Sequence, residues 1–566
     1  MGDFLTATRA QATKLVPAAL LAFFLLPVQA AGPVIPGAGE ILQQIQPVTP
    51  PAPSPGGTGL TTEPQKGEKL PPSVPFLVNA IRIMGNEKID TAMLQALVAD
   101  AAGKVLTLPE LDGYATRVTD YYHSQGYPLA RAVIPVQVIR SGVVRMVIIE
   151  ARYGKVGIDN LSRVNDSLLQ ATLAPLQSGQ VIAQPAVDRS LLLLSDIPGV
   201  AVRATLSPGD AAGVSDLLVE AAPGAAVSGN VTLDNYGTRY TGKARIGGMV
   251  SIINPLHHGD VLSLNGLSSG RDLDYGQLSY ESLLNGQGTR LGGSYSALHY
   301  MLGGPLTAIA AHGTAQVESL WLKHPLLRSP DANLYGQIQL DRKQLRDHID
   351  TGAIMTDRHL DNRTLSLAGD ARDSFLSAAV DSWNLGWTSG HVVFDDGAAR
   401  SLDASTARTQ GGFSKWNASL VRMQSLGPQD GLYLTFTGQW ASSNLDPSEK
   451  MIVGGPYTVR AYDMGVLSGD SGLLGSLEFR HNLGYVWYGQ WQAAAFFDTS
   501  HVTVNKSTWA AGANGASLNG IGVELIWIGA DQWTSSALIA TPIGAVPAQA
   551  AGSAGTRAWL NIGKKF

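Results

Sequence analysis

Three short stretches of the chain contain residue types that could perform catalysis or bind a ligand. The string GLSSG at residues 266–270 has the Gly-x-Ser-x-Gly spacing of a hydrolase nucleophile. That motif requires a strand before the serine and a helix after it, because the sharp turn between them exposes the hydroxyl. Here a strand-like run leads into Arg271 and Asp272 and then into another strand-like run. A Gly/Ser-rich loop is the better interpretation, with a hydrolase as the open alternative.

The best candidate for a metal site is the group His257, His258 and Asp260, and the nearest thing to a phosphate loop is GTRYTGK at 237–243. Adjacent residues of a strand point to opposite faces, so the two histidines would not chelate one ion well. In the second string Ala244 stands where Ser or Thr should ligate magnesium, and no helix is expected there. We therefore expect no metal site, no cofactor and no enzyme.

Composition narrows the class of protein further. The 566 residues exceed one ordinary domain, and charged residues make up 15% of the chain, against a typical ~25%. The formal net charge of −5 contains no basic excess that would point to nucleic acid. The absence of cysteine excludes thiolate catalysis, disulfides and cysteine-based metal sites.

The first 30 residues have the pattern of a secretory signal peptide. Arg9 and Lys14 supply the positive region, residues 15–26 form an apolar run, and residues 28–30 (VQA) fit a cleavage site. The apolar run is shorter than the ~20 residues that a spanning helix needs. An uncleaved membrane anchor stays open as the alternative.

Residues 31–73 are rich in Pro and Gly and predict an extended linker. Within it, residues 39–46 (GEILQQIQ) form a short helix candidate. Ile41, Leu42 and Ile45 would share one face of that helix. A frayed amphipathic turn or a disordered tail is the simpler alternative.

Two similar α/β units in tandem are expected at residues 74–152 and 153–222. Each reads as strand, two helices and two strands, which is an internal repeat. In the first unit we expect a helix capped by Asp90, and strands at 132–139 and 143–149 around a tight turn.

From about residue 226 to the end at 566, helical periodicity gives way to strict alternation of apolar and polar residues. Leu432, Leu434 and Phe436 alternate with tyrosine and threonines, for example. One apolar and one polar face is typical of a transmembrane β-barrel with lipid outside and water inside. At roughly 20 residues per strand and connection, this region predicts about 16 antiparallel strands. A soluble β-sandwich would produce a similar alternation.

Several of these stretches together resemble a known family, the two-partner secretion transporters (TpsB, the hemolysin secretion/activation proteins) of the outer-membrane-protein-85 superfamily. The first unit resembles a POTRA domain through YHSQGY at 122–127, IPVQ at 134–137 and VIIE at 147–150. The second resembles the next POTRA domain through LSDIPGV at 194–200. The barrel region carries LDNYGTRYTG at 233–242 and HPL at 324–326, with Arg328 beyond it.

The most specific part of the resemblance is the loop string Val459-Arg460-Ala461-Tyr462, followed by GDSG at 469–472. The family has VRGY or VRGF there, so Ala461 replaces a glycine, which matters only if the backbone needs a positive φ. Phe496 and Asp498 match the family's F-x-D-x-G strand motif, whose final glycine is Ser500 here.

The resemblance implies an outer-membrane pore that exports a secreted exoprotein (TpsA-like), with POTRA domains in the periplasm that bind the unfolded client. It also implies that Arg460 meets the barrel wall near Asp498, that the 39–46 helix plugs the barrel, and that outer-membrane lipid surrounds it. POTRA strand edges, including those at 133–139 and 143–149, are candidates for client binding. A superfamily barrel that assembles outer-membrane proteins or transports solutes is the alternative.

Overall fold

The computed structural model describes residues 35–45, 53–63 and 71–566. The expected signal peptide at 1–30 lies outside these residues. Within them, no helix is both long and apolar enough to cross a membrane.

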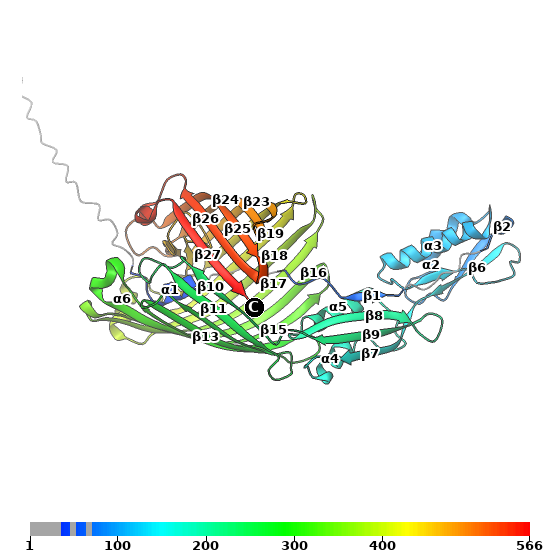
Figure 1. Ribbon diagram of the computed structural model, residues 1–566, viewed down its shortest axis with the longest axis horizontal. Coiled ribbons are helices and arrows are strands. Elements are labelled where there is room, and N and C mark those ends of the chain that lie inside the picture. Colours follow the sequence, from blue (N-terminus) through cyan, green and yellow to red (C-terminus); the bar gives the residue numbers. More distant parts are fainter. Residues whose placement is uncertain (1–34, 46–52, 64–70) are drawn as a thin grey trace, which may run out of the picture. The chain divides into compact units, whose positions relative to one another are not determined.

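The C-terminal region is a closed barrel of sixteen strands, as the alternation predicted (Figure 1). Each strand pairs antiparallel with its neighbours, and the last closes on the first, with Asn230 opposite Lys565. The strands are β10 (Val227–Asp234), β11 (Arg245–Ile253), β12 (Val261–Ser268), β13 (Leu273–Leu283), β14 (Arg290–Met301), β15 (Ala311–Arg328), β16 (Ala332–Ile349), β17 (Ile354–Asp373), β18 (Ala379–Phe394), β19 (Gly411–Ser425), β20 (Asp430–Ala441), β23 (Ser471–Val486), β24 (Gly489–Thr503), β25 (Gly515–Gly529), β26 (Trp533–Pro542) and β27 (Arg557–Lys565).

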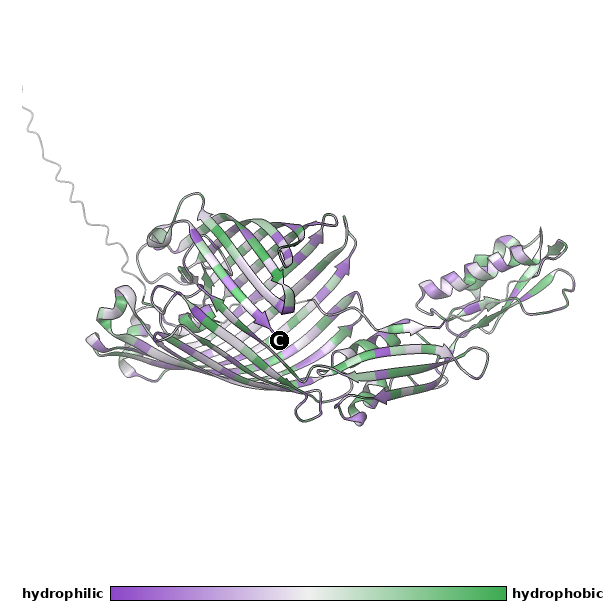
Figure 2. Cartoon of the chain, viewed as in Figure 1, coloured by the Kyte–Doolittle hydropathy of each residue, from purple (hydrophilic) through white to green (hydrophobic). Residues whose placement is uncertain are grey.

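The two faces of the barrel strands differ in chemistry, as the alternating colours along each strand in Figure 2 show. On β16, Ile338 and Leu340 are 52% and 46% exposed on the outer face. Between them, the side chain of Gln339 donates to the carboxylate of Asp341, 2.8 Å away, on the inner face. An apolar outside and a hydrogen-bonded inside suit a barrel in lipid, so the fold class predicted from the sequence is confirmed.

Several short helices and strands lie before the barrel strands or in the connections between them. A hairpin of β21 (Met451–Val453) and β22 (Leu467–Gly469) lies between β20 and β23 in the chain. The other short elements are α1 (Ala38–Ile45), α6 (Gly397–Ser405), η2 (Gly304–Ile309), η3 (Asp350–Gly352), η4 (Pro447–Glu449), η5 (Ala530–Gln532) and η6 (Ala548–Ser553).

The first α/β unit has a three-stranded sheet in the order β3-β6-β5, and a separate pair of β2 and β4. Asp90 caps its first helix by accepting from the backbone of Ala92, as expected, and Thr107 begins the second helix with a capping box. The elements are β2 (Phe76–Val78), β3 (Ala80–Met84), α2 (Thr91–Val98), η1 (Ala99–Ala101), β4 (Lys104–Leu106), α3 (Leu108–Ser124), β5 (Arg131–Val133) and β6 (Val143–Ile149).

The expected strand at 132–139 is wrong over most of its length, because β5 ends at Val133. Pro135 has no N–H for a ladder. Beyond it the side-chain amide of Gln137 takes the place of a neighbouring strand, because it accepts from and donates to the backbone of Arg145 at 2.8 Å each. The strand at 143–149 forms as β6, but it lies between β3 and β5 and is not an edge.

The second unit repeats this order around a four-stranded sheet, β1-β8-β9-β7. Its edge strand β1 (Leu60–Thr62) comes from the linker and pairs parallel with β8. The other elements are β7 (Arg152–Asn160), α4 (Asp166–Leu173), α5 (Gln184–Ser195), β8 (Val200–Pro208) and β9 (Val214–Pro223).

Two motif residues of the first unit form one buried contact. The hydroxyl of Tyr122, which is 0% exposed, donates to Glu150 at 2.9 Å, and the same carboxylate oxygen accepts from the backbone of Glu87 and Lys88. Burial and the neighbouring carboxylate raise the pKa of Tyr122 above its ordinary value. Since Glu87 and Lys88 lie in the turn that follows β3, the contact connects the end of α3 to that turn.

We expect Tyr122→Phe to destabilise the first unit by about 1.5 kcal/mol, because it removes one hydrogen bond from a buried carboxylate. Hydrogen exchange in the whole protein, followed by mass spectrometry, should then be about tenfold faster in α3 and β6. Tyr121→Phe, on the same helix, is the control. Equal exchange in the two variants would contradict the role given to Tyr122.

Candidate functional site

The connection between β20 and β23, residues 442–470, folds against the inner wall of the barrel, and we call it the lumen loop. It contains η4 and the β21–β22 hairpin. Side chains of the loop contact inward-facing residues of β23 and β24 on one wall. Others contact inward-facing residues of β16, β17 and β19, on the other side of β20 in the barrel order. The lumen loop is therefore tied to two separate parts of the barrel wall.

Arg460 is the best-connected residue of the lumen loop. Its guanidinium donates twice to Asp498, at 2.9 and 2.6 Å, and once to Glu478 at 2.7 Å. It also donates to Ser476 and lies over the ring of Phe496, 3.4 Å from the ring centroid. The side chain is 7% exposed, so this planar group is enclosed and fully paired.

The barrel register explains why these partners meet. Ser476 stands opposite Asp498, and Glu478 stands opposite Phe496, on the neighbouring strands β23 and β24. Since side chains two residues apart share a face, all four point inward. The backbone N–H of Arg460 adds a further bond to Asp498 at 3.0 Å. The motif thus fixes both the side chain and the main chain of the loop tip.

Ala461 fits the loop without strain. It is absent from the residues with positive φ, so its backbone lies in a region open to any residue. Its side chain is 0% exposed and lies against Gly520 of β25, where an added Cβ would be 2.6 Å from the Cβ of Ala461. The missing side chain at position 520 makes room for the methyl group that replaces the family's glycine hydrogen.

The flanking motif residues complete the packing of the loop tip. Val459 and Tyr462 are both 0% exposed and belong to an apolar cluster with Phe496 and Trp559. The indole of Trp559 on β27 also donates to the carbonyl of Arg460 at 2.8 Å. The tip is therefore held by strands from β23 round to β27.

The other end of the lumen loop is bound to the part of the wall formed by β16 to β19, which sequence reasoning missed. Glu449, 3% exposed, accepts from Lys343 at 2.6 Å and contacts Lys415 at 2.8 Å. The amide of Asn362 donates to the same carboxylate at 2.7 Å. The signal that could have found this contact was a lysine at an inward position on each of β16 and β19. A buried lysine requires an anion as its partner.

Helix α1 lies in the same space and contacts both the wall and the lumen loop (Figure 1). Ile41 and Leu42 are 1% and 5% exposed, and Ile45 packs partly buried against the same apolar cluster. The backbone N–H of Ala38 donates to Asp347 of β16 at 2.6 Å. Asp347 also pairs with Arg358, which in turn pairs with Asp446 of the loop.

The contact between α1 and the lumen loop is close. A Cβ added at Gly39 would lie 2.7 Å from Ser448, and the side chain of Gln43 donates to the carbonyl of Ser448. Gln44 is 9% exposed and packs against Gly465. Glycines at both places allow the helix and the loop to touch.

The catalytic and metal candidates of the sequence occupy unrelated places. Ser268 ends β12 and donates to Asp274 at 2.6 Å, within a strand-loop-strand connection. His257 contacts the carbonyl of Arg163 at 2.6 Å, while Asp260 accepts from backbone N–H groups and from Tyr280. Among the described residues, no three His, Asp or Glu side chains are grouped to hold a metal ion.

Comparison with protein families gives two matches. The model of the haemolysin secretion/activation proteins ShlB/FhaC/HecB matches residues 213–525. The model of the ShlB-type POTRA domain matches residues 76–151. The first match covers more than half of the chain and includes the whole lumen loop.

Individual relatives are similar in sequence over most of their length. The heme/hemopexin transporter protein HuxB of Haemophilus influenzae (strain 86-028NP) is 24% identical over 475 residues, covering 83% of this chain and 84% of the relative. The outer membrane transporter CdiB of Escherichia coli is 24% identical over 411 residues, 70% of this chain and 67% of the relative. The solved structure of CdiB from Escherichia coli has the same fold, with a TM-score of 0.70, 20% identity and coverage of 93% and 95%.

The contact of Ala461 with Gly520 leads to a prediction. Gly520→Ala places a methyl group against that of Ala461 and should destabilise the docked loop by about 1–3 kcal/mol. Limited proteolysis of the intact protein should then cut the lumen loop faster. The double variant Gly520→Ala with Ala461→Gly should restore resistance, because it moves the methyl group rather than adding one.

Gly276→Ala on β13 is the matched control, since nothing lies within 4 Å of an added Cβ there. Equal proteolysis of Gly276→Ala and Gly520→Ala would contradict the packing argument. So would a failure of the double variant to recover.

Proposed function

The chain belongs to the haemolysin secretion/activation protein family, and on this premise we propose that it exports a large partner exoprotein by the two-partner route. Its barrel lies in the bacterial outer membrane, and its POTRA domains lie in the periplasm. The observation that carries the proposal is the lumen, which is enclosed by sixteen strands and partly occupied by α1 and the lumen loop.

The free part of the lumen suits an unfolded polypeptide. Its wall presents hydroxyl and amide side chains that can exchange hydrogen bonds with a passing main chain and that make few demands on sequence. Six such residues are Ser319, Gln339, Asn417, Ser419, Thr435 and Thr437. A transporter that must pass a long and varied client needs a surface of this kind.

Client recognition is proposed for a strand edge of the periplasmic units. The edge of β8 already accepts an added strand, because β1 of the linker pairs there with Leu60 opposite Ala204. An extended client segment would bind the same edge by main-chain hydrogen bonds. In the first unit the available sheet edges are β3 and β5, and not β6.

At rest, α1 and the lumen loop close the pore together in this proposal. Both lie in the interior through which an ion current would have to pass. The protein acts as a transporter and not as an enzyme, with outer-membrane lipid against the apolar face of its strands. Folding of the client outside the cell is the expected driving force, as the family implies.

We expect Arg460→Ala to abolish export, because it leaves Asp498 without its paired cation, leaves Glu478 with Arg480 alone, and frees the loop tip. Losing one partner of such a cluster costs about 3–5 kcal/mol. The measurement is the amount of co-expressed client in the medium. Heat-modifiable mobility on gels should show that the barrel still inserts.

Arg460→Lys is the informative control, since lysine keeps the charge but not the fork that binds Asp498 twice. It should export an intermediate amount of client. Undiminished export by Arg460→Ala would refute the role of this residue.

A second prediction concerns α1. Deleting Ala38–Ile45 should raise ion conductance in planar bilayers, because the deletion removes the apolar contacts and the bond to Asp347 inside the barrel. Leu42→Asp should give a smaller rise in the same direction, since it buries a charge on the helix face. Conductance equal to that of the unaltered protein in both variants would count against the plug.

A further inference from the structure

The barrel binds a second part of the linker, at the ends of β15, β16 and β17 that face the second α/β unit. The carbonyl of Ser54 accepts from Arg372, and the carbonyl of Pro55 accepts from Arg328 at 2.9 Å. The backbone N–H of Ser54 donates to Asp370 at 3.1 Å. We call Arg328, Tyr335, Asp370 and Arg372 the mouth cradle.

The mouth cradle forms hydrogen bonds mainly with main-chain groups of the linker. Three of its contacts use main-chain groups of Ser54 and Pro55, which every peptide carries except for the N–H of proline. The hydroxyl of Ser54 adds bonds to Asp370 at 2.7 Å and to Tyr335 at 3.2 Å. Binding of this kind selects an extended polypeptide with little regard for its sequence.

The groups of the cradle are held in place by other residues. Arg328, 0% exposed in its side chain, donates to both oxygens of Asp196 in the second unit, at 2.7 and 2.9 Å. Asn333 accepts from Arg328 at 3.0 Å and donates to Asp370 at 2.9 Å. The cradle is therefore built independently of the linker and would persist after the linker leaves.

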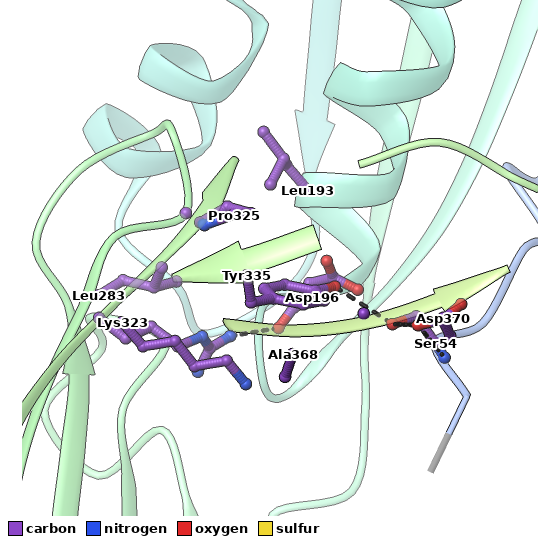
Figure 3. A pocket seen from close by; sticks show the side chains of 12 residues that line it. Ser54, Leu193, Asp196, Leu283, Lys323, Pro325, Tyr335, Ala368 and Asp370 are labelled. Carbon is purple, nitrogen blue, oxygen red and sulfur yellow. Dashed lines mark hydrogen bonds between the residues drawn. The ribbon is translucent and has the colours of Figure 1, made fainter. Parts of the chain in front are cut away.

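A cavity of about 270 Å³ opens beside the cradle and is lined by residues of the barrel and of the second unit (Figure 3). Ser54 lies at one side of it, with Asp196, Tyr335 and Ala368 among the other lining residues. The ammonium of Lys323 lies over the ring of Tyr335, 4.7 Å from the centroid, and makes no hydrogen bond or ion pair with the side chains of the described residues. The cavity thus has space and an unpaired cation for a neighbouring side chain.

We propose that the mouth cradle binds an extended segment of the exported polypeptide, which takes the place of linker residues 54 and 55 as it enters the barrel. This inference rests on the proposed function and names the place where the exported polypeptide first contacts the barrel. The cavity beside the cradle accommodates a side chain of that segment, and the ammonium of Lys323 favours an acidic one. The linker seated there is the template for this occupant.

The absence of cysteine from the chain makes disulfide cross-linking a direct test. Ala368→Cys lines the cavity without belonging to the cradle, and Thr435→Cys lines the lumen. Each variant is co-expressed with a client that carries spaced cysteines and a folded domain that stalls it in transit. We expect client adducts at both positions.

The two positions separate the failure of this inference from the failure of the proposed function. Adducts at Thr435→Cys without any at Ala368→Cys would overturn the cradle and leave export standing. No adduct at either position, together with no release into the medium of the same client without the stalling domain, would overturn the proposed function itself.

Two substitutions then test the cradle's chemistry. Arg372→Gln and Asp370→Asn each remove a charged partner of the backbone of Ser54, and each should reduce the adduct at Ala368→Cys about tenfold. Arg363→Gln, on the same strand β17 and outside the cradle, is the control. Undiminished adducts in both cradle variants would overturn the inference, because a merely structural role would leave the cross-link unchanged.

Discussion

The pairing of charges between the lumen loop and the barrel wall is the interaction on which the arrangement inside the barrel depends. The loop packs part of its length in an apolar cluster around Val459 and Tyr462, and buried ions tie it to two separate parts of the wall. Arg460 is bound by Asp498 and Glu478 on one side, and Glu449 by Lys343 and Lys415 on the other. Since an unpaired buried charge is costly, each pair holds its part of the loop in one position.

The loop in turn supports α1. The helix has eight residues, and a helix of that length is not stable by itself in water. Its apolar face is buried against the barrel cluster, while Gly39 and Gln44 lie against Ser448 and Gly465 of the loop. The position of the helix therefore depends on the position of the loop, and a movement that breaks the ion pairs of the loop also removes a support of the helix.

Local patterns predicted most of the fold because they come from local physics. Alternation with period two predicted the strands and their approximate number, and Asp90 predicted a helix start. The structure brings Arg460 and Asp498 together, as the family resemblance implied, while their role in export stays a prediction. The contacts of β1 and of Ser54 had no signal of this kind, because each joins segments far apart in the chain, and for Glu449 the signal was limited to the inward lysines of β16 and β19. The strand expected at 132–139 failed where the Gln137 amide replaced a backbone ladder.

The linker occupies three successive places that an exported chain would need. It adds β1 to the edge of β8, it lies in the mouth cradle at Ser54 and Pro55, and it continues as α1 inside the barrel. Each contact alone is small, with only three residues paired in β1. Because the contacts are joined in one chain, each raises the effective concentration of the next, and the set is stronger than its parts. In the function proposed above, a client that displaces the outermost contact would weaken the others, so that the pore would open stepwise from the periplasm.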